Sequence, residues 1–236
     1  MSDIKIERFL DLSKIFKKLE DKSYCIIKIP NVFPSYDIGS DLDIFCYNVQ
    51  DIAKIILSNI QELITTDLKI GITDNNTQIY IDIIKNDKIH FRFDLYGTLP
   101  YYKNVNIKEA FFSSVIENSQ IIKFDNTNIS VPSNIDEAIL RYIEYQEWYA
   151  QRPDKIKHIK YLEDKIETQE IDINKMFDKL HYYITIPDVS EDRIVSSIDS
   201  IRYVQYLYGN IKKVIKYIQV NGMKKTFDKI KSKIIK

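Results

Sequence analysis

The spacing of hydrophobic residues changes along this chain, and each spacing predicts a different kind of element. Apolar residues recur every three or four positions over several long stretches, as on one face of a helix. This spacing predicts helices at 6–19, 49–64, 107–117, 134–149, 154–167, 172–183, 190–207 and 210–235. Shorter runs rich in β-branched and aromatic residues predict strands near 24–29, 41–47, 67–73, 78–84 and 88–95. A hairpin is expected at 121–131, with its turn at Asn126.

The order of these elements predicts a fold class and two regions. Helices and strands alternate at first and strands then follow one another, so we expect an α/β (α+β) fold with a mixed sheet. After residue 131 the pattern is almost entirely helical. We therefore expect a domain at 1–131 and a helical region at 132–236. Ser133 has the character of a helix N-cap, with Asp136 in the place of a capping-box acid.

Two carboxylates interrupt the predicted strand at 41–47. Side chains of a strand alternate between faces, so Asp41 and Asp43 share one face while Leu42 packs on the other. Gly39 and Ser40 read as a turn that opens onto this strand. Two carboxylates held side by side are suited to Mg²⁺, which prefers oxygen ligands. The alternative is a solvated pair of acids at the end of a strand.

A third carboxylate lies in the middle of the predicted strand 88–95. Asp94 stands between Phe93 and Leu95, both apolar. If this strand lies beside the strand of Asp41 and Asp43, the three acids converge. Three converging carboxylates are typical of a two-metal site for phosphoryl transfer.

These motifs resemble the polymerase-β-like nucleotidyltransferase superfamily. Within it, they are most similar to the nucleotidyltransferase-like proteins associated with bacterial capsule and surface-polysaccharide biosynthesis. The resemblance covers about residues 22–165 and rests on Gly39–Ile44 and on Phe93-Asp94-Leu95, followed by Tyr101-Tyr102. It implies transfer of an NMP group from an NTP to a small acceptor such as a sugar phosphate. It also implies a Mg²⁺ (or Mn²⁺) cofactor held by Asp41, Asp43 and Asp94, with Asp94 also drawing the proton from the attacking hydroxyl.

The chain departs from the superfamily pattern before the acids. Typical members carry a Gly-Ser or Gly-Gly at a helix N-terminus, where backbone amides grip phosphate, whereas this chain has Ile29-Pro30-Asn31. Either Lys28, Gly39, Ser40 and the loop amides supply that grip, or the domain binds something other than an NTP. This departure allows an alternative, an inactive nucleotide- or sugar-binding accessory protein of the same fold. A further alternative is a toxin-antitoxin type nucleotidyltransferase acting on protein or RNA.

The helical region offers further candidates for substrate binding. Arg141 and Lys155 are expected to bind phosphate or a sugar acid, and nearby aromatic residues to stack on a base or sugar. These aromatic residues are Tyr142, Tyr145 and Trp148. The alternative is that they pack between helices and that Asp154 caps the next helix.

Charge and composition indicate which partners the protein binds and where in the cell it is located. The net charge is zero, but residues 209–236 contain nine lysines and one acid, Asp228. This amphipathic segment either lies on an anionic membrane surface or packs on its own domain. Nucleic acid is not expected as a partner, because that segment has no arginine and few aromatic residues that could stack on bases. The sequence shows no signal peptide, so a cytoplasmic location is expected, and Cys25 and Cys46 are expected to be buried in strands.

Overall fold

The computed structural model describes residues 10–61, 67–103, 105–148, 152–185 and Met223. The chain divides into two compact units. The sheet unit contains residues 5–101 and 107–137, and the helical unit contains 1–4, 102–106 and 138–236. The division falls inside a helix, a few residues beyond the expected boundary at 131.

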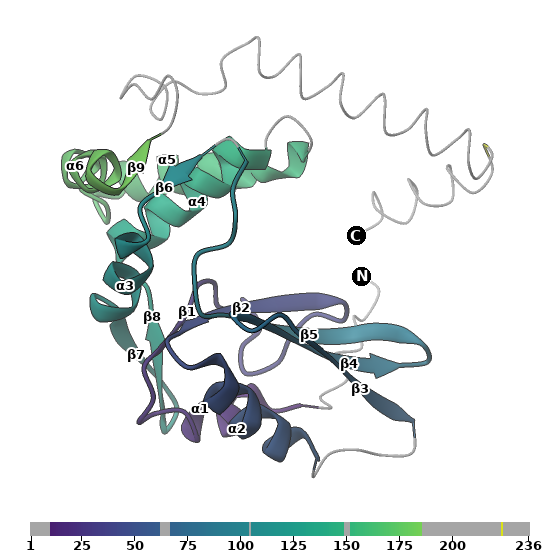
Figure 1. Ribbon diagram of the computed structural model, residues 1–236. Coiled ribbons are helices and arrows are strands. Elements are labelled where there is room, and N and C mark those ends of the chain that lie inside the picture. Colours follow the sequence, from purple (N-terminus) through teal and green to yellow (C-terminus); the bar gives the residue numbers. More distant parts are fainter. Residues whose placement is uncertain (1–9, 62–66, 104, 149–151, 186–222, 224–236) are drawn as a thin grey trace. The chain divides into compact units, whose positions relative to one another are not determined.

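A five-stranded sheet forms the centre of the sheet unit (Figure 1). Its strands, in spatial order, are β1 (Tyr24–Ile26), β2 (Ser40–Cys46), β5 (Lys88–Tyr96), β4 (Gln78–Lys85) and β3 (Leu68–Asp74). The central pair, β2 and β5, is parallel, and the other neighbours are antiparallel. The predicted α/β (α+β) class with a mixed sheet is therefore confirmed.

Two helices cover one face of this sheet, α1 (Leu12–Lys17) and α2 (Val49–Gln61). Leu42, Ile44 and Phe93 point into this core with at most 1% of their surface exposed. Within the described residues, the helix that was predicted at 6–19 begins only at Leu12. Asp11 is the N-cap, because its side chain accepts a hydrogen bond from the Ser13 N–H at 3.1 Å.

A helix and a hairpin complete the sheet unit. These are α3 (Ala110–Glu117), β7 (Gln120–Phe124) and β8 (Thr127–Val131). Phe112 of α3 lies 5.0 Å from Phe45, ring centroid to ring centroid, on the sheet face opposite α2. The hairpin turns at residues 125–126, which confirms the predicted turn. Cys25 and Cys46 are free and fully buried in strands, as expected.

The helical unit continues from α4 (Asn134–Trp148), which crosses the division between the units. It contains the 3₁₀ turn η1 (Pro153–Lys155), α5 (Ile156–Glu167) and α6 (Ile173–Tyr183), at the predicted positions. A short ladder joins β6 (Asn106–Ile107) to β9 (Ile184–Thr185), so the expected helix at 107–117 begins only at Ala110. Neither short strand was predicted. The expected helices 190–207 and 210–235 lie outside the described residues, apart from Met223.

The start of α4 provides a test of local stability. The Ser133 Oγ donates to Asp136 Oδ2 at 2.8 Å and accepts from the Asp136 N–H at 3.2 Å. Ser133→Ala removes both bonds, so we expect the free energy of unfolding in urea to fall by about 1 kcal/mol. Ser133→Thr keeps the hydroxyl and is expected to lose clearly less. Equal losses in the two variants would show that the hydroxyl is not the source of the stability.

Candidate functional site

Two carboxylates meet where β2 runs parallel to β5. Asp43 is the register partner of Asp94, and neighbouring strands lie about 4.8 Å apart. Both side chains lie on the sheet face opposite the core, because Leu42 and Phe93 alternate with them and point inward. The strand of Asp94 therefore lies beside the strand of Asp43, which is the condition for the acids to converge.

Asp41 shares this face but has a different neighbour. It is exposed, and its register partner on β5 is Arg92 rather than a carboxylate. Among the described residues, no three or more His, Cys, Asp or Glu side chains form a group that could hold a metal ion as they stand. Joint metal binding by Asp41, Asp43 and Asp94 therefore stays a prediction, and the two carboxylates that the strand register places opposite each other are Asp43 and Asp94.

The environment of Asp94 is unusual for a carboxylate. Only 7% of the residue is exposed, and its Oδ1 is buried without a hydrogen-bond partner. Burial, and next the negative charge of Asp43, raise the pKa of Asp94 to about 7, although Arg92 opposes the rise. A cation bound beside this pair would relieve both the burial cost and the repulsion. Because Mg²⁺ is commonly held by one or two carboxylates plus substrate oxygens, the residues present fit such an ion.

A row of charged residues runs beside this pair. Asp41, Arg92 and Asp82 are register partners across β2, β5 and β4. Arg92 Nε and Nη2 donate to the two carboxylate oxygens of Asp82 at 2.6 and 3.1 Å. Arg92 and Asp82 were not predicted from the sequence. The signal that could have found them is the alternation of polar and apolar residues along both strands, the same pattern that revealed Asp41 and Asp43.

Tyr80 also belongs to this face and was missed. It is the register partner of Asp94 on β4, and its ring centroid lies 5.5 Å from the guanidinium carbon of Arg92. Burial and the nearby charge of Asp94 raise the pKa of the Tyr80 hydroxyl. Tyr80 therefore lies next to Asp94, across the strand from Asp43.

The turn before β2 positions the acids, but its backbone N–H groups already donate hydrogen bonds within the protein. Gly39 has φ +80°, a left-handed conformation that glycine adopts readily. The Gly39 N–H donates to the His90 carbonyl at 2.8 Å, and the Ser40 N–H donates to the Asp37 carbonyl at 3.0 Å. Neither amide is available for phosphate in this conformation. The Ser40 hydroxyl is different, because it is buried and has no hydrogen-bond partner.

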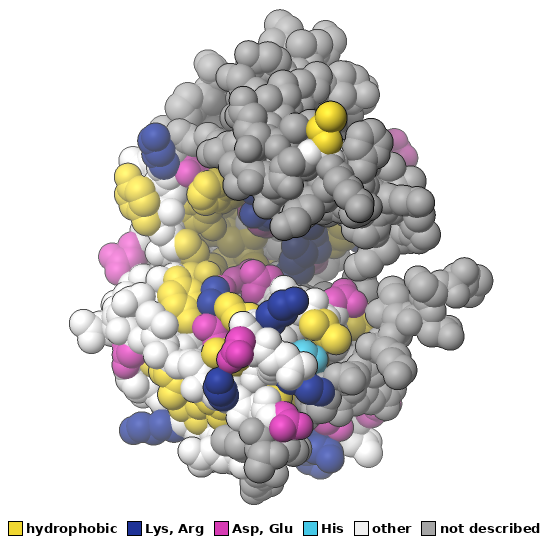
Figure 2. Space-filling view, turned by 90° about the vertical axis from the view of Figure 1, so that its right-hand side faces the viewer, with side chains coloured by type: hydrophobic (Ala, Val, Ile, Leu, Met, Phe, Trp, Pro, Cys, Tyr) yellow, Lys and Arg dark blue, Asp and Glu magenta, His cyan; other side chains and the backbone are white. Residues whose placement is uncertain are grey.

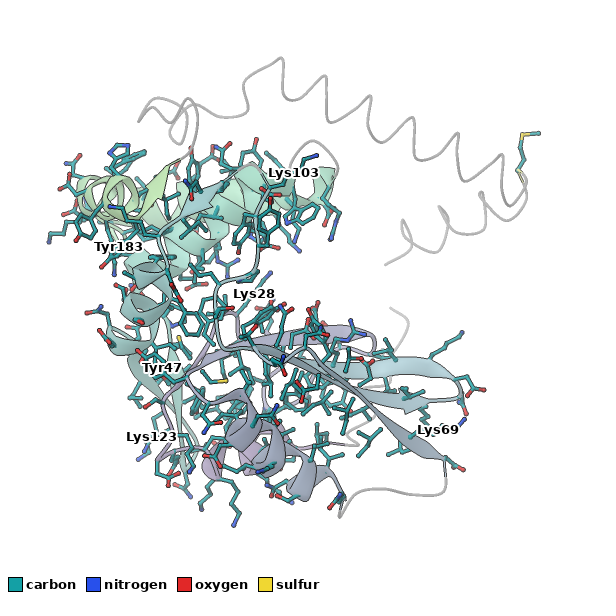
Figure 3. The ribbon with its side chains drawn as sticks, in the orientation of Figure 1. Lys28, Tyr47, Lys69, Lys103, Lys123 and Tyr183 are labelled. Carbon is teal, nitrogen blue, oxygen red and sulfur yellow. The ribbon has the colours of Figure 1, made fainter. Side chains whose placement is uncertain are left out.

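Lys28 follows β1 and is exposed. Figure 3 shows it on the side of the sheet away from α2, whereas Lys69 lies at the far edge, on β3. The Ile27 N–H beside Lys28 donates to the Asp43 carbonyl at 3.0 Å, which ties this loop to the strand of the acids. Figure 2 shows basic and acidic side chains intermingled over the face in view. On the face in view, an anionic ligand would therefore be attracted by local groups rather than by one large basic patch.

Arg141 and Lys155 belong to the helical unit and have partners within it. The guanidinium carbon of Arg141 lies 3.9 Å from the ring centroid of Tyr161. Lys155 is 8% exposed, and its ammonium group pairs with Glu144, which also lies 3.0 Å from His158 Nε2. Burial raises the pKa of Glu144, but His158 and Lys155 outweigh it and hold the pKa well below its usual range. These contacts are those of packing within the unit, and a substrate-binding role for Arg141 and Lys155 stays a prediction.

The remaining predictions for the helical unit have different outcomes. Tyr142 and Tyr145 are buried, as packing between helices requires, whereas Trp148 is 43% exposed. The expected cap at Asp154 is wrong, because Lys155 occupies the N-cap position of α5 and Asp154 pairs with Arg152 at 3.0 Å.

Comparisons of this chain with protein-family models, curated proteins and solved structures found no match. Within the part of the chain that the structure describes, no helix has the length and apolar character needed to cross a bilayer. The resemblance to nucleotidyltransferases therefore rests on the sequence motifs, and the lysine-rich segment 209–236 lies outside the described residues apart from Met223.

Proposed function

We propose that the sheet unit is a metal-dependent nucleotidyltransferase domain that moves an NMP group from an NTP to a small acceptor. A sugar phosphate or another surface-polysaccharide precursor is the acceptor class that the sequence resemblance favours. The observation that carries the proposal is the Asp43–Asp94 register pair, in which Asp94 has a buried carboxylate oxygen without a hydrogen bond. A structural acid would be expected to have its oxygens satisfied by neighbouring donors.

Each residue of the site has a defined task in this proposal. Asp43 and Asp94 hold the divalent ion, which would neutralise phosphate charge and make the α-phosphorus more electrophilic. Asp41 adds negative charge at the exposed end of the pair. Asp94 accepts the proton of the attacking acceptor hydroxyl, whose oxygen forms the new bond to phosphorus as pyrophosphate leaves.

Since these substrates are NTPs, we propose a cytoplasmic location, with residues 209–236 as a contact to the inner membrane face.

One observation favours a second candidate, an inactive binding protein of the same fold. The amides of Gly39 and Ser40 are already bonded to carbonyl groups of the protein, so the turn lacks the amide cradle that commonly grips triphosphate. A protein of this kind would bind a nucleotide or sugar through the same face without turning it over.

A thermal-shift assay of the full chain with each of the four NTPs and Mg²⁺ tests the proposal. We expect at least one NTP to raise the melting temperature only when Mg²⁺ is present. Asp43→Asn should lose this shift, while its metal-free melting temperature stays the same or rises slightly because two adjacent carboxylates no longer repel each other. The control is Asp87→Asn, which removes an exposed acid from the β4–β5 turn.

The outcomes separate the two candidates. Pyrophosphate release with a sugar-phosphate acceptor, lost in Asp43→Asn, supports the enzyme. Stabilisation by a nucleotide or nucleotide sugar without turnover favours the binding protein. If no NTP stabilises the protein, or if Asp43→Asn retains the shift, the nucleotidyltransferase proposal is rejected.

A further inference from the structure

Three carboxylates surround Arg92 on its face of the sheet. The register places Asp41 on one side and Asp82 on the other, while Asp94 lies two residues further along the same strand. Arg92 Nε is 2.6 Å from Asp82 Oδ1 and 3.7 Å from Asp94 Oδ1. The guanidinium group is therefore hydrogen-bonded to Asp82, and with Asp94 it forms only a longer ion pair without a hydrogen bond.

The contact with Asp82 fixes the orientation of Arg92. Nε and Nη2 donate to separate oxygens of one carboxylate, at 2.6 and 3.1 Å. Such a bidentate pair sets the plane of the guanidinium group, whereas a single bond leaves it free to rotate. The side chain of Asp82 is only 16% exposed, so water competes weakly for these bonds.

The state of Asp94 shows what this restraint achieves. Asp94 is 93% buried, given its 7% exposure, yet its Oδ1 has no hydrogen-bond partner. Arg92 Nε lies 3.7 Å from Asp94 Oδ1, and this separation is too long for a hydrogen bond. A small movement of Arg92 would close this gap and satisfy the carboxylate. The movement would also bring the positive charge closer to the Asp43–Asp94 pair, where the proposed function places a divalent ion.

We propose that Asp82 is a positioning residue that holds Arg92 away from Asp94 and so keeps the Asp43–Asp94 pair available to a divalent cation. This inference rests on the metal site of the proposed function. A guanidinium group and a divalent ion compete for the same carboxylate. Either cation would neutralise the negative charge of the carboxylate, and the two cations repel each other. Asp82 decides this competition without contacting the ion.

Binding of Mn²⁺ to the nucleotide-free full chain, followed by electron paramagnetic resonance, tests the inference. We expect Asp82→Asn to weaken binding by about 10- to 100-fold, the range typical of residues that orient metal ligands. The released Arg92 would then move closer and form a hydrogen bond with Asp94. Asp82→Glu, which can still accept two hydrogen bonds, is expected to bind nearly as the wild type does.

The decisive variant is the double substitution Asp82→Asn with Arg92→Met. With the competing cation removed, Mn²⁺ affinity should return most of the way to that of the wild type, although Asp82 is still missing. Asp87→Asn is the matched control, since it removes one acid from the same hairpin at an exposed position that pairs with Lys69 at 2.9 Å. Asn also tolerates the left-handed backbone found there, φ 56°. The control should bind Mn²⁺ as the wild type does.

Three results would overturn the inference: unchanged affinity in Asp82→Asn, a double variant as weak as Asp82→Asn, or wild-type protein that binds no Mn²⁺. If Asp82→Asn does not fold, the single variant Arg92→Met carries the test. It should bind Mn²⁺ at least as tightly as the wild type, and weaker binding would overturn the inference. The proposed function fails separately, since Mn²⁺ binding with the expected pattern but without nucleotide turnover rejects the enzyme and leaves the role of Asp82 intact.

Discussion

Asp94→Asn is expected to stabilise the metal-free protein by roughly 4 kcal/mol at pH 8, from a pKa that rises from 3.8 to about 7 on folding. Burial, together with the neighbouring charge of Asp43, disfavours the ionised form of Asp94 in the folded state. Its favourable contribution to stability is complete below the unfolded-state pKa. It is lost as the pH rises through the folded-state pKa of about 7. The neutral Asn side chain never meets this cost.

Urea denaturation in the presence of EDTA, from pH 5 to pH 8, measures the effect. The advantage of Asp94→Asn over the wild type should grow with pH across this range and level off above about pH 8. Asp87→Asn provides the control, because that side chain is 86% exposed and lies at the turn of the same hairpin. A loss of stability in Asp94→Asn at every pH would show that the carboxylate is needed to hold the fold.

Phe93→Ala is expected to lower the free energy of unfolding by about 3–5 kcal/mol, the usual cost of truncating a buried aromatic residue. Phe93 is fully buried, and its ring lies edge-on to that of Phe91, with the centroids 5.0 Å apart. The cavity opens directly behind Asp94, on the opposite side of the same strand. Equilibrium unfolding in urea measures the loss.

Ile72→Ala is the matched control for this core substitution. Ile72 lies on β3, the edge strand of the same sheet, and is 55% exposed. We expect its truncation to change the free energy of unfolding by less than about 1 kcal/mol. Similar losses in both variants would contradict the assignment of the core to the face that carries Phe93.

The alternation of side chains predicted much of the site, because the period of a strand determines its two faces. Asp43 and Asp94 each stand between apolar residues, and the structure places those neighbours in the core. What alternation cannot predict is the order and register of the strands. That Asp94 meets Asp43 while Asp41 meets Arg92 depends on how β5 docks on β2. Docking of this kind is determined by packing across the whole sheet.

Outside the sheet, too, local features could be predicted from the sequence, whereas contacts between distant residues could not. The hydroxyl cap at Ser133 is a local feature, so the sequence was sufficient to predict it. Lys155 is buried through an ion pair with Glu144 on another helix, and no periodic pattern reveals such a partner. Strand β9 has two residues, which is too short for any period to be visible.

The parallel pairing of β2 with β5 also determines when the site can exist during synthesis. Strands β4 and β5 are joined by a tight turn, whereas α2, β3 and β4 separate β2 from β5 along the chain. Such distant segments pair later than local hairpins. A nascent chain that has left the ribosome only as far as β4 carries Asp41 and Asp43 but lacks Asp94 and Arg92. Asp94, which completes the carboxylate pair, and Arg92, the cation that could block it, therefore arrive together on β5, the last strand of the five-stranded sheet to be made.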